Sequence, residues 1–194
     1  MIKAIVFDCF GVLITDGLEL LVQQLEQTQP DARKQVFDII RQVNMGMLNP
    51  AESHRMLAEY LQVSDTEWRQ KVSAGEVKNL ELITWIKELR RHYKTALLSN
   101  TGKGSLARRF ELAELDELFD EIVASADVGM VKPDPDIYKL TADRLQVLPE
   151  ECVYFDDRPH QVEGASAIGM HAFLFTNVGQ ARRDLQTTLA DTKR

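Results

Sequence analysis

Short apolar runs recur along the chain, and segments with helical periodicity separate them. The first run, Ala4 to Phe7, ends at Asp8 and is followed by a turn at Gly11. A short run of continuous apolar residues fits a strand that is buried on both faces. Similar runs occur at residues 96–98, 121–123, 152–155 and 171–174. The pattern therefore predicts a set of short, buried strands.

The segments between these runs predict helices. Apolar residues recur at helical spacing between residues 80 and 89, and again between residues 137 and 145. Asp134 is suited to cap the second of these helices, with Pro135 at its first position, because proline needs no N–H donor there. Strands that alternate with helices predict an α/β fold, in which a parallel sheet carries helices on both faces.

One long stretch, residues 17–75, breaks the alternation and contains amphipathic helical segments instead of strands. One segment carries an apolar stripe from Val36 to Val43, a second begins at Asn49, and a third begins with a capping box at Ser64. Such an insertion can serve stability alone. Its position directly after the first strand, where open parallel sheets bind ligands, favours a lid. We therefore expect a helical cap over a core made of residues 1–16 and 76–194.

Composition narrows the range of functions. The chain has 194 residues, of which 44% are hydrophobic and 27% charged, as in ordinary globular proteins. Its net charge of -7 argues against nucleic acid as a partner, because phosphate backbones are held by clusters of Lys and Arg. Two cysteines favour a reducing compartment. The apolar run before Asp8 is too short for a signal peptide or a membrane span, so we expect a cytoplasmic protein.

Polar residues follow several of the predicted strands. They are Asp8, the pair Ser99-Asn100, Lys132 in a later loop, and the pair Asp156-Asp157. Each has an ordinary structural explanation when it is taken alone, as a helix cap, a turn or a surface charge. The carboxyl ends of parallel strands, however, meet at one edge of a sheet. We therefore expect these residues to form one site.

The residue types in this set suit phosphoryl chemistry. Carboxylates tolerate close approach when a hard cation such as Mg²⁺ neutralises them. A lysine and a hydroxyl supply charge and hydrogen-bond donors for a phosphoryl group. An aspartate at the centre can act as a nucleophile.

The segments that carry these residues resemble the four motifs of the haloacid dehalogenase superfamily. They are residues 7–13 for the first motif, 98–101 for the second, 131–138 for the third and 154–165 for the fourth. Their order and spacing match across nearly the whole chain, and the insertion lies where subfamily I keeps its helical C1 cap. The resemblance implies a three-layer, Rossmann-like α/β core with an inserted helical cap.

The resemblance also implies a role for each residue. Asp8 would attack phosphorus and form an aspartyl-phosphate. Ser99 and the backbone amide of Asn100 would bind the phosphoryl group, while Lys132 would fix Asp8 and neutralise charge. The implied Mg²⁺ ligands are Asp8, the backbone carbonyl of Phe10, Asp157 and, beside it, Asp156. We expect a small phosphorylated substrate, neither a nucleic acid nor a membrane as partner, and a monomer or homodimer.

One position departs from the pattern of most phosphatases in the superfamily. They carry a second aspartate, a general acid, two residues after the nucleophile, where this chain has Phe10. General acid-base assistance is typically worth about 100- to 10,000-fold in rate, so its loss limits a phosphatase without abolishing it.

Two branches of the superfamily lack this aspartate. Haloacid dehalogenases have an aromatic residue there, but they use no metal and lack paired aspartates in the fourth motif. Sugar-phosphate phosphatases resembling the alpha-glucose-1-phosphate phosphatases, and N-terminal domains of some epoxide hydrolases, keep the other motifs that this chain has. We therefore predict a Mg²⁺-dependent phosphatase that acts on a sugar phosphate or similar phosphomonoester. The alternatives are a 2-haloacid dehalogenase with Asp8 as nucleophile, and a catalytically impaired protein that binds a phosphorylated ligand.

Overall fold

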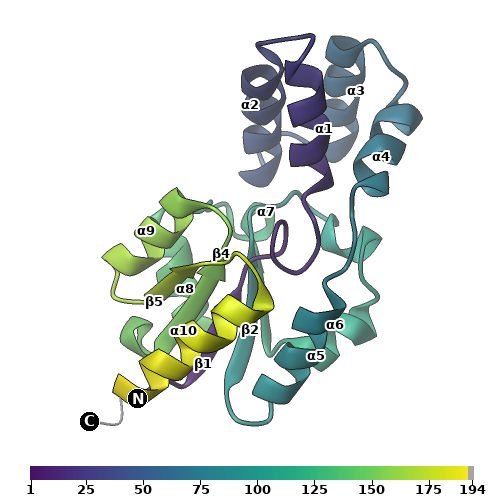
Figure 1. Cartoon of the computed structure of the whole chain (residues 1–194). Helices are drawn as coiled ribbons and strands as arrows, with labels where there is room; N and C mark the ends of the chain where they lie inside the picture. Colours follow the sequence, from purple (N-terminus) through teal and green to yellow (C-terminus); the bar gives the residue numbers. More distant parts are fainter. Residues whose placement is uncertain (192–194) are drawn as a thin grey trace.

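A five-stranded parallel sheet forms the centre of the molecule, in a computed structural model that describes residues 1–191 (Figure 1). Residues 192–194, the end of the predicted core segment, lie outside the described residues. The strands have the order β3-β2-β1-β4-β5. Their bounds are β1 Ala4–Phe7, β2 Lys94–Ser99, β3 Glu121–Ala124, β4 Cys152–Asp156 and β5 His171–Leu174. The predicted parallel sheet with helices on both faces is confirmed.

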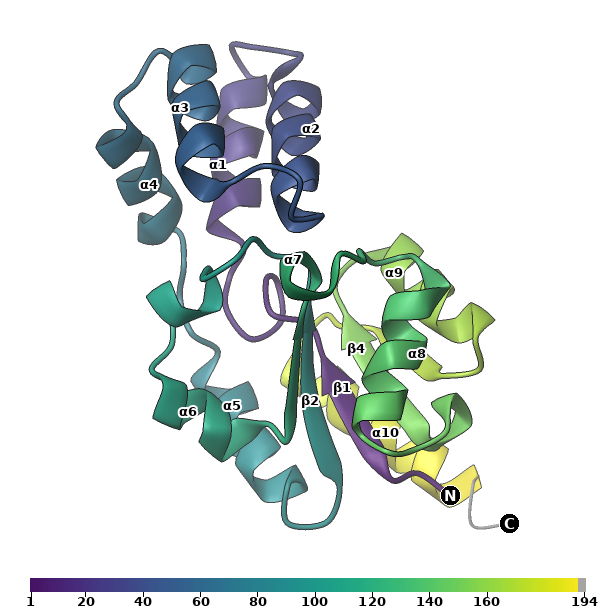
Figure 2. The same cartoon turned by 180° about the vertical axis from the view of Figure 1, so that it is seen from behind.

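Successive residues of the central strand β1 point to opposite faces of the sheet, as strand geometry requires. Ile5 and Phe7 pack against one group of helices, α5 (Leu80–Leu89), α6 (Leu112–Leu118) and α10 (Val178–Asp191). Ala4 and Val6 pack against the other group, α8 (Pro135–Arg144) and α9 (Pro159–Ala167). This double burial explains why the strand reads as a continuous apolar run. Figure 2 shows α8 and α9 in front of the sheet and α10 behind it.

Four helices form a separate group beyond the carboxyl edge of the sheet (Figures 1 and 2). They are α1 (Gly17–Glu26), α2 (Ala32–Asn44), α3 (Pro50–Leu61) and α4 (Asp65–Ala74). The group has its own apolar core, which includes Val22, Val36, Leu57 and Trp68. Asn49 and Ser64 cap α3 and α4 as the sequence predicted. The predicted helical insertion is confirmed, while the division at residues 16 and 76 stays a prediction.

The two chain segments that join the insertion to the sheet run side by side. The Thr15 amide donates to the Val77 carbonyl at 3.0 Å, and the Thr15 hydroxyl accepts from the Val77 amide at 2.7 Å. The same hydroxyl donates to the carbonyl of Gly75. Ile14 and Lys78 pair as an isolated antiparallel bridge. A short two-stranded ladder therefore carries the insertion.

The remaining elements are short. They are α7 (Ser125–Val128) and the 3-10 turns η1 (Leu106–Arg108) and η2 (Pro149–Glu151). Among residues 1–191, no helix is both long and apolar enough to cross a bilayer.

Candidate active site

The polar residues predicted from the sequence meet at the carboxyl edge of the sheet. Asp8 follows β1, Ser99 ends β2 and Asp156 ends β4. The chain leaves β1 toward β2 on one side of the sheet, whereas β4 and β5 lie on the other side. This divergence opens a crevice at the ends of β1 and β4, where α/β sheets bind ligands.

Lys132 is the electrostatic centre of the site. Its Nζ lies 2.8 Å from Asp8 Oδ1 and 2.7 Å from Asp156 Oδ2, and it donates to the Leu98 carbonyl at 3.0 Å. Its side chain is fully buried. Burial lowers the pKa of Lys132, but the carboxylates of Asp8 and Asp156 outweigh that effect and raise it overall. Lys132 therefore stays charged and fixes the orientation of Asp8.

Asp156 is fully buried and all its oxygens have protein partners. Besides Lys132, its Oδ2 accepts the hydroxyl proton of Tyr154, and its Oδ1 accepts from the Arg158 amide at 2.9 Å. Sequence reasoning did not single out Tyr154, because an aromatic residue inside an apolar strand normally only packs. In this geometry Asp156 holds Lys132 in place beneath Asp8.

Asn100 and Ser99 occupy the neighbouring strand end. The Asn100 side chain makes two hydrogen bonds to the backbone of Lys132, accepting from its amide at 2.8 Å and donating to its carbonyl at 2.9 Å. Ser99 is completely buried, and its hydroxyl has no hydrogen-bond partner among the described residues. A buried hydroxyl without a partner is costly, so Ser99 is suited to bond an oxygen of a ligand.

A group of carboxylates suits a divalent cation. Asp8, Asp156 and Asp157 each offer an oxygen, and these oxygens lie within 4.8 Å of one another. Asp157 Oδ1 is buried and has no hydrogen-bond partner among the described residues. Gly11, with φ +87°, lets the Asp157 carboxylate approach, because a Cβ at Gly11 would lie 2.1 Å from Asp157 Oδ2. These oxygen donors fit Mg²⁺, which prefers oxygen ligands.

The pKa values of the carboxyl groups reflect the same crowding. Burial raises the pKa of Asp157 to about 6, and the Asp156 carboxylate adds to the increase. Burial also raises the pKa of Asp8 well above its ordinary range, although Lys132 opposes that rise. A cation bound between these groups would favour their ionised forms.

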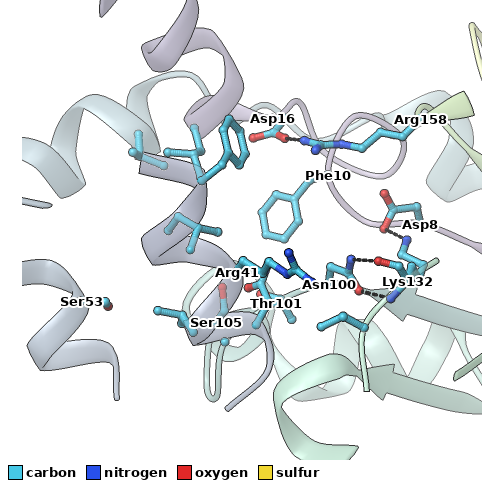
Figure 3. A pocket seen from close by; sticks show the side chains of 18 of the residues that line it. Asp8, Phe10, Asp16, Arg41, Ser53, Asn100, Thr101, Ser105, Lys132 and Arg158 are labelled. Atoms are coloured by element: carbon cyan, nitrogen blue, oxygen red, sulfur yellow. Dashed lines mark hydrogen bonds and ion pairs between the residues drawn. The ribbon is translucent and has the colours of Figure 1, made fainter. Parts of the chain in front are cut away.

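A cavity of about 530 Å³ separates the sheet edge from the helical insertion. Of the predicted site residues, Asp8, Phe10, Asn100 and Lys132 line it (Figure 3). Asp157 lines a smaller recess beside it, and neither Asp156 nor Ser99 reaches the wall of the cavity. The volume suits a small organic molecule.

Two ion pairs line the cavity together with Phe10, and sequence reasoning missed both. Arg109 lies over the Phe10 ring with 5.0 Å from its guanidinium carbon to the ring centroid, and its Nε donates to Glu76 at 2.9 Å. Arg158 donates to Asp16 at 2.9 Å, as drawn in Figure 3. Asp16 precedes α1 and Arg158 follows β4, so no local sequence pattern links them. The aromatic ring fills the centre of the wall where a general acid would stand.

Comparison with known proteins extends these observations. The sequence profile of the family described as haloacid dehalogenase-like hydrolase matches residues 2–169. A Mycobacterium tuberculosis phosphatase is 38% identical over 103 residues, which are 50% of this chain and 48% of that protein. The chain thus spans about half the length of that relative. The phosphorylated carbohydrates phosphatase of Thermotoga maritima is 28% identical over 181 residues, covering 87% of this chain and 82% of that protein.

Solved structures share the fold. A family enzyme of Bacteroides thetaiotaomicron, in complex with magnesium and inorganic phosphate, has a TM-score of 0.73 and 22% sequence identity. The alignment covers 91% of this chain and 95% of that chain.

Proposed function

The chain belongs to the haloacid dehalogenase-like hydrolases, and from this premise we propose that it hydrolyses small phosphomonoesters with the help of Mg²⁺. One observation carries the proposal. Asp8 faces the cavity while Lys132 holds its Oδ1 at 2.8 Å, and the carboxylates of Asp156 and Asp157 lie within reach of the same point. This set combines a positioned nucleophile with donors for a hard cation.

In the proposed reaction, an oxygen of Asp8 attacks phosphorus, and the bond from phosphorus to the leaving oxygen breaks. The alcohol leaves with a proton taken from solvent or another group, and water then hydrolyses the aspartyl-phosphate. Lys132 and the hydroxyl of Ser99 stabilise the negative charge on the phosphoryl oxygens. Asp8, Asp157 and the Phe10 carbonyl, with Asp156 beside them, would hold Mg²⁺, which would supply further charge neutralisation.

Relatives support a phosphorylated substrate of modest size. The Thermotoga maritima protein, which aligns over most of both chains, acts on phosphorylated carbohydrates by its name. The cavity of about 530 Å³ is large enough for a sugar phosphate. We therefore propose a sugar phosphate or a similar phosphomonoester as substrate.

Phe10 favours a second candidate function, 2-haloacid dehalogenation. Halide leaves without a proton, so an enzyme of that kind needs no acid at this position. The carboxylates of Asp8, Asp156 and Asp157 argue against it. Lys132 pairs with two of the three, and without a bound cation the remaining negative charge repels a haloacid anion at the nucleophile. Measurement of halide release from 2-chloropropionate, with and without chelator, separates the two activities. A protein that only binds a phosphorylated ligand would release neither phosphate nor halide.

Removal of divalent metal is expected to lower phosphate release by at least about 100-fold, since a metal ion supplies several kcal/mol of transition-state stabilisation. The measurement is phosphate release from a panel of sugar phosphates and an activated aryl phosphate, in Mg²⁺ and in EDTA. Activity should return when Mg²⁺ is restored. Mg²⁺ should also raise the Tm of the wild type through binding to the folded state, and Asp157→Asn should reduce that rise. Equal activity with and without EDTA would contradict the proposal.

Phe10→Asp is expected to raise kcat for substrates with poor leaving groups by about 10- to 100-fold, because it adds a general acid beside the nucleophile. The effect should be small for an aryl phosphate, whose leaving group needs little protonation. Phe10→Asn is the matched control, since it has the same shape but transfers no proton at neutral pH. Equal kcat values for Phe10→Asp and Phe10→Asn with alkyl phosphates would show that proton transfer does not limit turnover.

A further inference from the structure

The cavity wall carries more positive than negative charge. Its acidic residues among those described are Asp8, Asp16 and Glu76, and its lysine and arginine residues are Arg41, Arg108, Arg109, Lys132 and Arg158. Each acidic residue has a basic partner: Lys132 for Asp8, Arg158 for Asp16 and Arg109 for Glu76. Arg41 and Arg108 have no acidic partner among the described residues.

Neither guanidinium has an ion pair or hydrogen bond within residues 1–191. Arg41 belongs to α2 of the helical insertion. Arg108 belongs to η1 of the core. Both side chains are exposed, and both line the cavity. Two cations, one from the insertion and one from the core, therefore line the same cavity without an ion-pair partner among the described residues.

A third donor without an acceptor lines the same cavity. Trp68 of α4 is only 5% exposed, and its indole Nε1 has no partner among the described residues. A buried donor without an acceptor is costly, so this wall suits a group that offers oxygen acceptors. His54 of α3 lines the wall as well. Burial lowers its pKa, the carboxylate of Asp65 opposes that effect, and the positive charges of Arg69 and Arg108 lower the pKa further.

The cavity extends beyond its catalytic end. In Figure 3, Ser53, the neighbour of His54, lies on the opposite side of the cavity from Asp8 and Lys132. The phosphoryl group proposed to react at Asp8 therefore leaves room for a second part of the substrate near α3 and α4. The residues that line the cavity include two arginines without an acidic partner among the described residues, and this excess of positive charge favours an anion.

We propose that the substrate carries a second anionic group, a carboxylate or a phosphate, which binds to Arg41 and Arg108 in the cavity that Asp8 also lines. This inference rests on the proposed phosphatase function for the position of the first anion. It assigns substrate selection to one arginine from the insertion and one from the core.

The test compares substrates that differ by one anionic group. The pairs are glycerol 3-phosphate with 3-phosphoglycerate, and fructose 6-phosphate with fructose 1,6-bisphosphate, which test a carboxylate and a phosphate separately. The wild type should show kcat/KM at least about tenfold higher for the doubly anionic member of one pair. Arg41→Gln and Arg108→Gln should each lower that ratio about tenfold, which corresponds to ~1.4 kcal/mol, chiefly by raising KM.

Lys103→Gln is the matched control. Lys103 is exposed on the loop that leads to η1, and it does not line the cavity. This variant loses one positive charge at a position close to Arg108 in the sequence. It should keep the wild-type ratio of kcat/KM between the two members of each pair. A wild-type ratio near one for both pairs, or equal ratios in Arg108→Gln and Lys103→Gln, would overturn the inference.

Binding to Asp8→Asn separates this inference from the proposed function. Isothermal titration calorimetry of this variant should show about tenfold tighter binding of 3-phosphoglycerate or fructose 1,6-bisphosphate than of its singly anionic partner. Addition of Arg108→Gln should remove that preference. The preference without any phosphate release by the wild type would refute the phosphatase and keep the anion site. Phosphate release by the wild type without the binding preference would refute the anion site and keep the phosphatase. The absence of phosphate release and of the preference would refute both proposals.

Discussion

Asp8→Asn is expected to lower kcat for phosphate release by at least about 10⁴-fold, which corresponds to about 5.4 kcal/mol of transition-state stabilisation. An amide oxygen is a poor nucleophile, and Asp156, the other carboxylate paired with Lys132, does not line the cavity. Asp8 Oδ1 is 2.8 Å from Lys132 Nζ, so the carboxylate is oriented before substrate binds. The measurement is kcat with an aryl phosphate in saturating Mg²⁺.

The same variant should fold as stably as the wild type, or more stably. Burial raises the pKa of Asp8 in the folded protein, so the ionised carboxylate destabilises the native state at pH values above its unfolded pKa. A neutral asparagine removes that cost. Unfolding in urea at pH 7.5 checks this, and Asp136→Asn, on the exposed surface of α8, serves as a control that keeps full activity. More than about a tenth of wild-type activity in Asp8→Asn would show that another group is the nucleophile.

Lys132→Met is expected to destabilise the protein by about 3–5 kcal/mol, the usual effect of breaking a buried ion pair by removal of one partner. Lys132 lies between Asp8 and Asp156, both within 2.8 Å, and its loss leaves two buried carboxylates without a counter-charge. In a domain of this size the change amounts to roughly 6–20 °C in Tm. Thermal and urea unfolding give the measurement.

The pH dependence of this loss provides a second readout. Lys132 lowers the pKa of Asp8, so its removal should raise that pKa and make a neutral Asp8 more common. The destabilisation should therefore be largest at high pH and shrink as pH falls and Asp8 becomes protonated. Lys139→Met, which removes an exposed ion pair with Asp136, should change stability little at any pH. If Lys132→Met changed the free energy of unfolding as little as Lys139→Met does, the buried carboxylates would be neutral in the folded wild type.

Much of the fold followed from local sequence pattern. Buried parallel strands leave continuous apolar runs, and the residue types at Asn49, Ser64 and Asp134 marked helix starts that the structure confirms. Helix α1 was not picked out individually. This helix starts after Asp16, whose side chain accepts a hydrogen bond from the Glu19 amide. Its apolar residues are buried only by packing against the other helices of the insertion.

The site was predictable in part for the same reason. Strand ends converge at one edge, so the residues that follow strands could be expected to meet. The sequence did not reveal that Asp156 and Tyr154 hold Lys132, because side-chain directions at a strand end depend on tertiary packing. Nor did it distinguish Arg41 and Arg108 from other surface arginines, since only the folded chain shows which acidic residues already have partners.

The ladder formed by Thr15 with Gly75 and Val77 has an evolutionary consequence. The chain leaves the sheet and returns to it at adjacent points, so the insertion begins and ends at one place on the core. Duplication, shortening or replacement of the intervening helices alters nothing in the order or spacing of the five strands. Selectivity can therefore diversify among descendants of such a gene while the hydrolytic machinery is inherited intact.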